Sequence, residues 1–80
     1  MKYAVLFGFR KSDIDDVGYL SESDGRIAVQ KDRSLARRFS LRRKRGEKGW
    51  ASPEKWRDFF NEDMPEWKFH VIRLTEPANR

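Results

Sequence analysis

The amino-acid sequence predicts a small α+β domain, with a mostly antiparallel sheet of about four strands and two helices on one face, in the order β-β-β-α-α-β. Three observations lead to this prediction. They are an alternating apolar run at residues 3–9, an Asp-Gly pair between two further apolar runs, and a Ser-Pro-Glu helix start at residues 52–54. The chain has 80 residues, so we expect a single domain over residues 1–80.

The first strand is expected over residues 2–9. Its odd positions, Tyr3, Val5, Phe7 and Phe9, alternate with Ala4, Leu6 and Gly8. Both faces of this stretch are therefore apolar or small, which is typical of a central strand that is covered on both sides.

A hairpin of two strands is expected next. Asp24 and Gly25 follow the apolar run at residues 17–23, and both residue types tolerate the positive φ angles of a type I′ turn. A two-residue turn at this place pairs Leu20 with Val29 and Glu22 with Ile27, so Leu20, Ile27 and Val29 share one side. We expect that side to face the core. Residues 11–16 are polar and acidic, and we interpret them as a loop before the hairpin.

A first helix is expected after Asp32, whose side chain can cap it. Leu35, Ala36 and Phe39 have the spacing of an apolar helix stripe. No apolar residue occurs from residue 42 to residue 49, so we expect this helix to end in a basic loop.

The second helix has clearer end signals. Ser52 can cap it, Pro53 suits its first position, and the carboxylate of Glu54 suits the positive end of the helix dipole. Its expected buried stripe consists of Trp56, Phe59 and Phe60. Pro65 ends the helix, and the alternation of apolar and polar residues from Trp67 to Val71 predicts a final strand.

Positive charge is concentrated in one segment. The formal net charge is +5, and residues 33–48 hold eight basic side chains and one acidic side chain. Residues 1–32 and residues 49–80 each hold five basic and six acidic side chains. Phosphate binding needs several long cationic side chains on one surface, and arginine can bind phosphate with two parallel hydrogen bonds. We therefore expect a binding surface made of Arg33, Arg37, Arg38, Arg42, Arg43, Lys44, Arg45 and Lys48, with Trp50 as a side chain that could stack on a base.

The alternative is a solvent-exposed helix face whose charge has no specific binding partner. On a helix, Arg38, Arg42 and Arg45 would lie on one side. The acidic side chains that usually balance such a face are absent from this segment, which favours binding.

Composition also limits the function. One histidine and no cysteine leave few ways to build a nucleophile, a proton shuttle or a metal site, so we expect no enzyme activity, no metal and no cofactor. The longest apolar run has seven residues, from Tyr3 to Phe9, which is shorter than the roughly 20 residues of a membrane helix. The first dozen residues lack the pattern of a secretory signal, and we expect a cytoplasmic protein without a membrane partner.

In size and layout the chain resembles the small proteins of bacteriophages and other mobile elements, a group that includes anti-CRISPR proteins and inhibitors of host polymerases. The resemblance lies in the opening strand Lys2–Phe9, the Asp24-Gly25 hairpin, the segment Asp32–Phe39 and the aromatic closing strand Glu66–Leu74. It implies a stoichiometric, non-enzymatic binder that blocks a host nucleoprotein machine such as a CRISPR surveillance complex. It carries over no functional residue.

Two functions remain open from the sequence. The first is a non-catalytic inhibitor of the phage type, which docks onto a host complex that handles nucleic acid through the basic surface. The alternative is direct, weakly sequence-specific binding of DNA or RNA by the same surface. An exposed edge strand in so small a sheet also makes a homodimer plausible.

Overall fold

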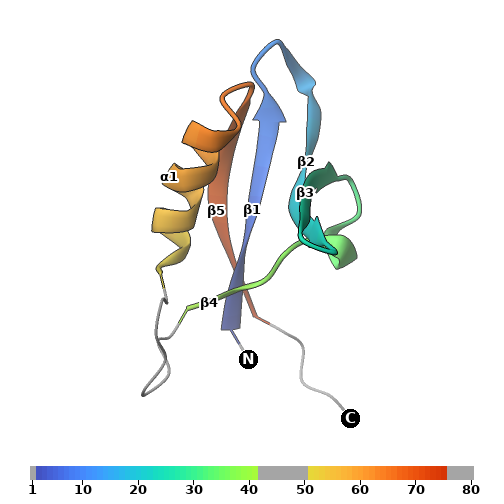
Figure 1. The fold of residues 1–80 in the computed structure, drawn as a ribbon. Helices are drawn as coiled ribbons and strands as arrows, with labels where there is room; N and C mark the ends of the chain where they lie inside the picture. Colours follow the sequence, from blue (N-terminus) through green and yellow to red (C-terminus); the bar gives the residue numbers. More distant parts are fainter. Residues whose placement is uncertain (1, 42–50, 76–80) are drawn as a thin grey trace.

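The computed structural model describes residues 2–41 and 51–75 (Figure 1). In these ranges the chain forms five strands, one α-helix and one short 3₁₀ helix, and no helix has the length and apolar character needed to cross a membrane. The strands are β1 (Lys2–Arg10), β2 (Asp13–Ser23), β3 (Arg26–Gln30), β4 (Phe39–Ser40) and β5 (Trp67–Thr75). The helices are η1 (Arg33–Leu35) and α1 (Pro53–Asp63).

Strand β1 lies at the centre of an antiparallel sheet. One edge of β1 pairs along its whole length with β5, from Lys2 opposite Thr75 to Arg10 opposite Trp67. The other edge is shared by two strands, because β2 pairs with the second half of β1 and β4 pairs with Tyr3 and Ala4. Strand β3 extends the sheet beyond β2. The predicted central position of the first strand is therefore confirmed.

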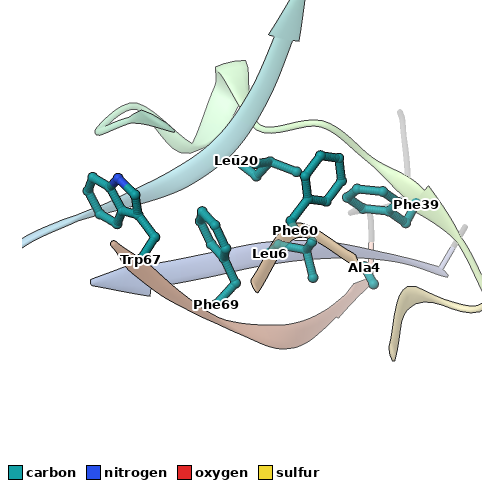
Figure 2. Close-up of a cluster of buried hydrophobic side chains, with 7 residues drawn as sticks. All are labelled: Ala4, Leu6, Leu20, Phe39, Phe60, Trp67 and Phe69. Carbon is teal, nitrogen blue, oxygen red and sulfur yellow. The ribbon is translucent and has the colours of Figure 1, made fainter. Parts of the chain in front are cut away.

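The core lies between one face of this sheet and α1. The buried cluster contains Phe39, Phe60, Trp67 and Phe69, with Leu6, Leu20 and Ala4 between the rings (Figure 2). Leu6 and Leu20 have no measurable exposure to solvent, and burying each of them contributes about 1.5–3 kcal/mol. Ile27 and Val29 pack against the same cluster.

The hairpin and the second helix follow the sequence closely. Asp24 and Gly25 both have positive φ angles, 52° and 75°, as a type I′ turn requires. The register of β2 and β3 pairs Leu20 with Val29 and Glu22 with Ile27, as predicted. The Ser52 hydroxyl accepts a hydrogen bond from the backbone N–H of Lys55 at 3.2 Å and so caps α1.

The predicted first helix is wrong. Asp32 does act as a cap, with its Oδ1 accepting from the backbone N–H of Ser34 at 2.9 Å, but only η1 follows. The chain becomes extended at Ala36, and the backbone N–H of Arg37 then donates to the Leu20 carbonyl of β2 at 2.8 Å. Phe39 continues as β4 beside β1. Backbone pairing with two strands thus overrides a weak helix preference.

Three smaller expectations also differ. Strand β2 begins at Asp13, so the polar stretch at residues 11–16 is mostly strand and contains a bulge opposite the end of β1. Phe59, expected in the core, is 52% exposed, whereas Phe60 is 3% exposed. The predicted basic loop at residues 42–49 lies outside the described residues.

Candidate functional site

The face of the sheet opposite α1 is only partly open, because Ser21 is 7% exposed and its hydroxyl donates to the Leu35 carbonyl of η1 at 2.6 Å. Val5 on the same face is 1% exposed. Side chains alternate along each strand, so the strand register decides which residues this face carries. We call it the open face. Its strand positions are Tyr3, Val5, Phe7 and Phe9 of β1, Val17, Tyr19, Ser21 and Ser23 of β2, Arg26, Ala28 and Gln30 of β3, Ser40 of β4, and Lys68, His70, Ile72 and Leu74 of β5.

Aromatic side chains cross the open face in a row. Phe7 lies opposite Tyr19 on one side and opposite His70 on the other. The ring centroids of Phe7 and Tyr19 are 4.8 Å apart, with the ring planes tilted by 59°. Phe7 and Tyr19 are half-buried and His70 is exposed. We call Tyr19, Phe7 and His70 the aromatic row.

A second layer of rings continues the aromatic row along β1. Phe9 is stacked on His70, with centroids 6.2 Å apart and planes 26° from parallel. At the other end of the strand, the guanidinium of Arg38 lies 4.4 Å from the centroid of the Tyr3 ring. Phe9 and Tyr3 are also half-buried. The open face therefore offers several adjacent ring surfaces that solvent reaches.

Cations flank the rings of the open face on two strands. Among the positions named above, the charged residues are Arg26 on β3 and Lys68 on β5, while β2 carries the exposed carboxylates Asp13 and Asp15 just before Val17. Arg38 adds a third cation above Tyr3. The described carboxylates that adjoin these positions in sequence are Asp15, two residues before Val17 in β2, and Asp24 in the hairpin turn, next to Ser23. Such a surface is complementary to a ligand that combines flat apolar groups with negative charge.

A hollow of about 480 Å³ lies on the hairpin part of the open face. Its lining is polar and small, with one cation and one carboxylate, and consists of Ser21, Ser23, Asp24, Arg26, Ala28 and Gln30. Gln30 is the strand partner of Tyr19, so the hollow adjoins the aromatic row. Hydroxyl, amide, carboxylate and guanidinium groups together supply both hydrogen-bond donors and acceptors there.

The described arginines of the sequence-predicted surface lie in different places. Arg37 is part of the fold, because its Nη1 is 3.2 Å from Glu22 Oε1 and its guanidinium lies 4.9 Å from the ring centroids of both Phe39 and Trp56. Arg33 is exposed on η1, and Arg38 reaches the open face. The remaining predicted residues, Arg42, Arg43, Lys44, Arg45, Lys48 and Trp50, lie outside the described residues.

The sequence analysis missed the aromatic residues of the open face. The signal was present, since residues 3–9 are apolar on both faces and the prediction placed both helices on one face of the sheet. One apolar face of the sheet was therefore predicted without a helix over it. An uncovered apolar face of this kind is a candidate binding surface.

A second polar group lies on the helix side of the sheet, at the end of β1. Arg10 Nε donates to Asp16 Oδ2 at 2.9 Å, and Lys31 Nζ is 3.8 Å from Asp16 Oδ1. The hydrogen bond from Arg10 holds the pKa of Asp16 below its usual value. The Arg10 guanidinium also lies 4.8 Å from the centre of the Trp67 ring. These contacts join β1 to β2 beside the bulge, so we assign this polar group a structural role.

Within residues 2–41 and 51–75, no group of three or more His, Cys, Asp or Glu side chains has an arrangement that could hold a metal ion. The open face is therefore the described surface with the most distinctive chemistry. No model of a known protein family, no curated protein and no solved structure matches this chain.

Proposed function

We propose that this protein is a non-catalytic binding protein and that it binds nucleic acid on the open face. The observation that carries the proposal is the combination of solvent-accessible aromatic rings with exposed cations on the flanking strands, Arg26 on β3 and Lys68 on β5. Nucleic acids present planar bases and a regular array of phosphates, so both features of the face have a counterpart in one ligand.

The basic segment supports the same ligand. Its described part reaches the open face at Arg38, whose guanidinium lies 4.4 Å from the centroid of the Tyr3 ring. Eight of the sixteen residues from 33 to 48 are basic. Phosphates bound by Arg26, Arg38 and Lys68 would give the binding its salt dependence.

We propose binding and not catalysis because of the groups that the open face offers. Its centre is made of the rings of Tyr19, Phe7 and His70, and His70 is the one histidine of the sequence. A general acid and a general base need two titratable groups that share one reacting centre. Aromatic rings and cations, by contrast, are sufficient to bind a nucleic-acid strand.

The test is a salt titration of binding, followed by fluorescence anisotropy of labelled oligonucleotides of random sequence. Several phosphate contacts should give a steep loss of affinity between about 50 and 200 mM salt. Arg26→Glu and Lys68→Glu should each weaken binding and flatten the salt dependence. Lys55→Glu is the matched control, because Lys55 is exposed on α1 and away from the open face. Failure to bind any oligonucleotide at about 50 mM salt would eliminate the proposal.

A second candidate is favoured by the localised charge of residues 33–48. In this version the protein docks onto a host nucleoprotein complex as a stoichiometric inhibitor, as its resemblance to small phage proteins implies. Affinity capture from host lysate with and without nuclease separates the two candidates. Capture that survives nuclease treatment supports docking onto protein, whereas capture that depends on intact nucleic acid supports direct binding.

A further inference from the structure

We propose that the open face takes single-stranded nucleic acid, with unpaired bases stacked on the aromatic row, and this inference rests on the proposed function. The juxtaposition that carries it is a line of three rings across three strands. Phe7 lies opposite both Tyr19 and His70, and Phe9 stacks on His70 in the next layer. Successive bases of one nucleic-acid strand could therefore stack on the neighbouring rings of Tyr19, Phe7 and His70 while the nucleic-acid backbone runs in one direction.

Stacking selects a single strand over a duplex. In a duplex each base is stacked between its neighbours, and a protein reaches only the base edges in the grooves. The rings of Phe7, Phe9 and Tyr19 are half-buried in the sheet, so they cannot extend into a groove. Their accessible surface is available to a base that has left its own stack, and each such contact contributes about 1–3 kcal/mol.

The cations lie around the aromatic row, where phosphates of a strand would pass. Lys68 is opposite Phe9 on one margin, and Arg26 lies on the other margin beyond the hollow. Arg38 lies over Tyr3, four residues before Phe7 in β1. A nucleic-acid strand with its bases on the rings would keep its phosphates toward these cations.

The hollow beside Tyr19 gives this face a place for the polar edge of a base. A base stacked on Tyr19 would lie next to Gln30, the strand partner of Tyr19. The side chains of Gln30, Ser21 and Arg26 line the hollow, and its volume of about 480 Å³ exceeds that of one nucleobase. Asp24 at its far end disfavours a phosphate there but can accept a hydrogen bond from a base amino group.

The experiment compares three labelled probes of about 12 nucleotides, a length within the usual range for single-strand sites. They are a single strand, the matching duplex, and a strand of the same length without bases. The single strand should bind at least roughly tenfold more tightly than the other two, which is the contribution of one stacked base. Equal binding of the strand without bases, or of the duplex, would overturn the stacking inference and leave the proposed function standing. No binding of any probe would overturn both.

Variants of single rings then test which side chains of the aromatic row stack on bases. Phe7→Leu and Tyr19→Leu remove a ring but keep an apolar side chain, and each should weaken single-strand binding by about tenfold without changing the weak duplex binding. His70→Ala tests the row at an exposed position, where the fold does not depend on the side chain. Phe59→Leu is the control, since Phe59 is an exposed ring on α1, on the opposite side of the sheet.

A second copy of the chain is the rival occupant of the open face, and sedimentation of the free protein tests it. A dimer that Phe7→Leu and His70→Ala convert to a monomer, with single-strand binding unchanged, would make the open face a self-association surface and overturn the inference. A monomer whose anisotropy signal is lost in the same variants supports it.

Discussion

Asn61 on α1 holds the outer edge of β5 through both backbone groups of Phe69. Its Oδ1 accepts from the Phe69 N–H at 2.7 Å, and its Nδ2 donates to the Phe69 carbonyl at 3.4 Å. A side-chain amide thus replaces the missing neighbouring strand at this point of the edge. The same contact fixes α1 against the sheet, so the helix covers one face only and the open face is left accessible.

Replacing Asn61 should loosen this contact. Asn61→Ala removes both hydrogen bonds and should lower the free energy of unfolding by about 1–3 kcal/mol, because a half-buried N–H loses its acceptor. Urea denaturation measures the change. Asn61→Asp keeps the acceptor and loses the donor, so it should cost less than the alanine variant. Equal urea midpoints for Asn61→Ala and the unmodified protein would show that the contact does not stabilise the fold.

A methyl group at Gly8 should not fit between β1 and β5. An added Cβ would lie 2.4 Å from the Lys68 carbonyl oxygen and 2.7 Å from the Phe69 ring, and the carbonyl cannot move without shifting β5. We expect Gly8→Ala to lower the melting temperature, with a loss of stability of about 1–3 kcal/mol or more.

The control for Gly8→Ala is Gly25→Ala in the hairpin turn. An added Cβ at Gly25 meets no atom within 4 Å, and the cost there comes only from the φ angle of 75°. That cost is about 1 kcal/mol. A Gly8→Ala protein that melts above Gly25→Ala would contradict the close packing of β1 against β5.

Arg37 and Arg38 are neighbours in sequence with different roles. Arg37→Ala removes the ion pair with Glu22 and the contacts with the Phe39 and Trp56 rings, so we expect a loss of about 1–2 kcal/mol in urea denaturation. Arg38→Ala should change nucleic-acid binding more than stability, since Arg38 is exposed over Tyr3.

These roles would be contradicted if the Arg37 variant changed binding and the Arg38 variant changed stability. Weakened oligonucleotide binding in a stably folded Arg37→Ala protein would put Arg37 in the interface. Arg33→Ala is the control for a surface arginine, and its stability should change by no more than about 0.5 kcal/mol.

The elements with strong local signals were predictable from the sequence. The Asp24-Gly25 turn fixes the register of β2 and β3 by itself, because both residues accept positive φ angles. Ser52 and Pro53 likewise begin α1 at the predicted place. In each case the determining interactions lie within a few residues of one another, so the sequence contains them.

The segment after Asp32 was not predictable in the same way. Its structure depends on the Leu20 carbonyl, which accepts from Arg37, and on Tyr3 and Ala4, which pair with β4. These partners are distant in sequence and appear only after the sheet has formed. The candidate site was missed for a related reason: the pattern of residues 3–9 shows that both faces are apolar, but only the folded chain shows which face α1 covers.

The ion pair of Glu54 with Arg73 should make stability depend on pH. The hydrogen bond from Arg73 holds the pKa of Glu54 below its ordinary value of 4.5. A carboxyl group with a lower pKa in the folded chain than in the unfolded chain stabilises the fold above the unfolded pKa, and this contribution is lost as the pH falls through the folded pKa. The urea midpoint should therefore decrease as the pH is lowered below about 4.5.

Variants of Glu54 and Arg73 measure how much of the loss of stability at low pH comes from their ion pair. Asp16 and Asp32 also have lowered pKa values, caused by hydrogen bonds from Arg10 and from Ser34 respectively, so they contribute with the same sign and part of the pH dependence must remain when Glu54 is neutral. Glu54→Gln should show a smaller decrease at low pH than the unmodified protein, and Arg73→Leu should reduce the decrease to a similar extent because it removes both the charge and the hydrogen-bond donor. A Glu54→Gln protein that loses stability as steeply with falling pH as the unmodified protein would show that the pair between α1 and β5 does not set the acid sensitivity of the fold.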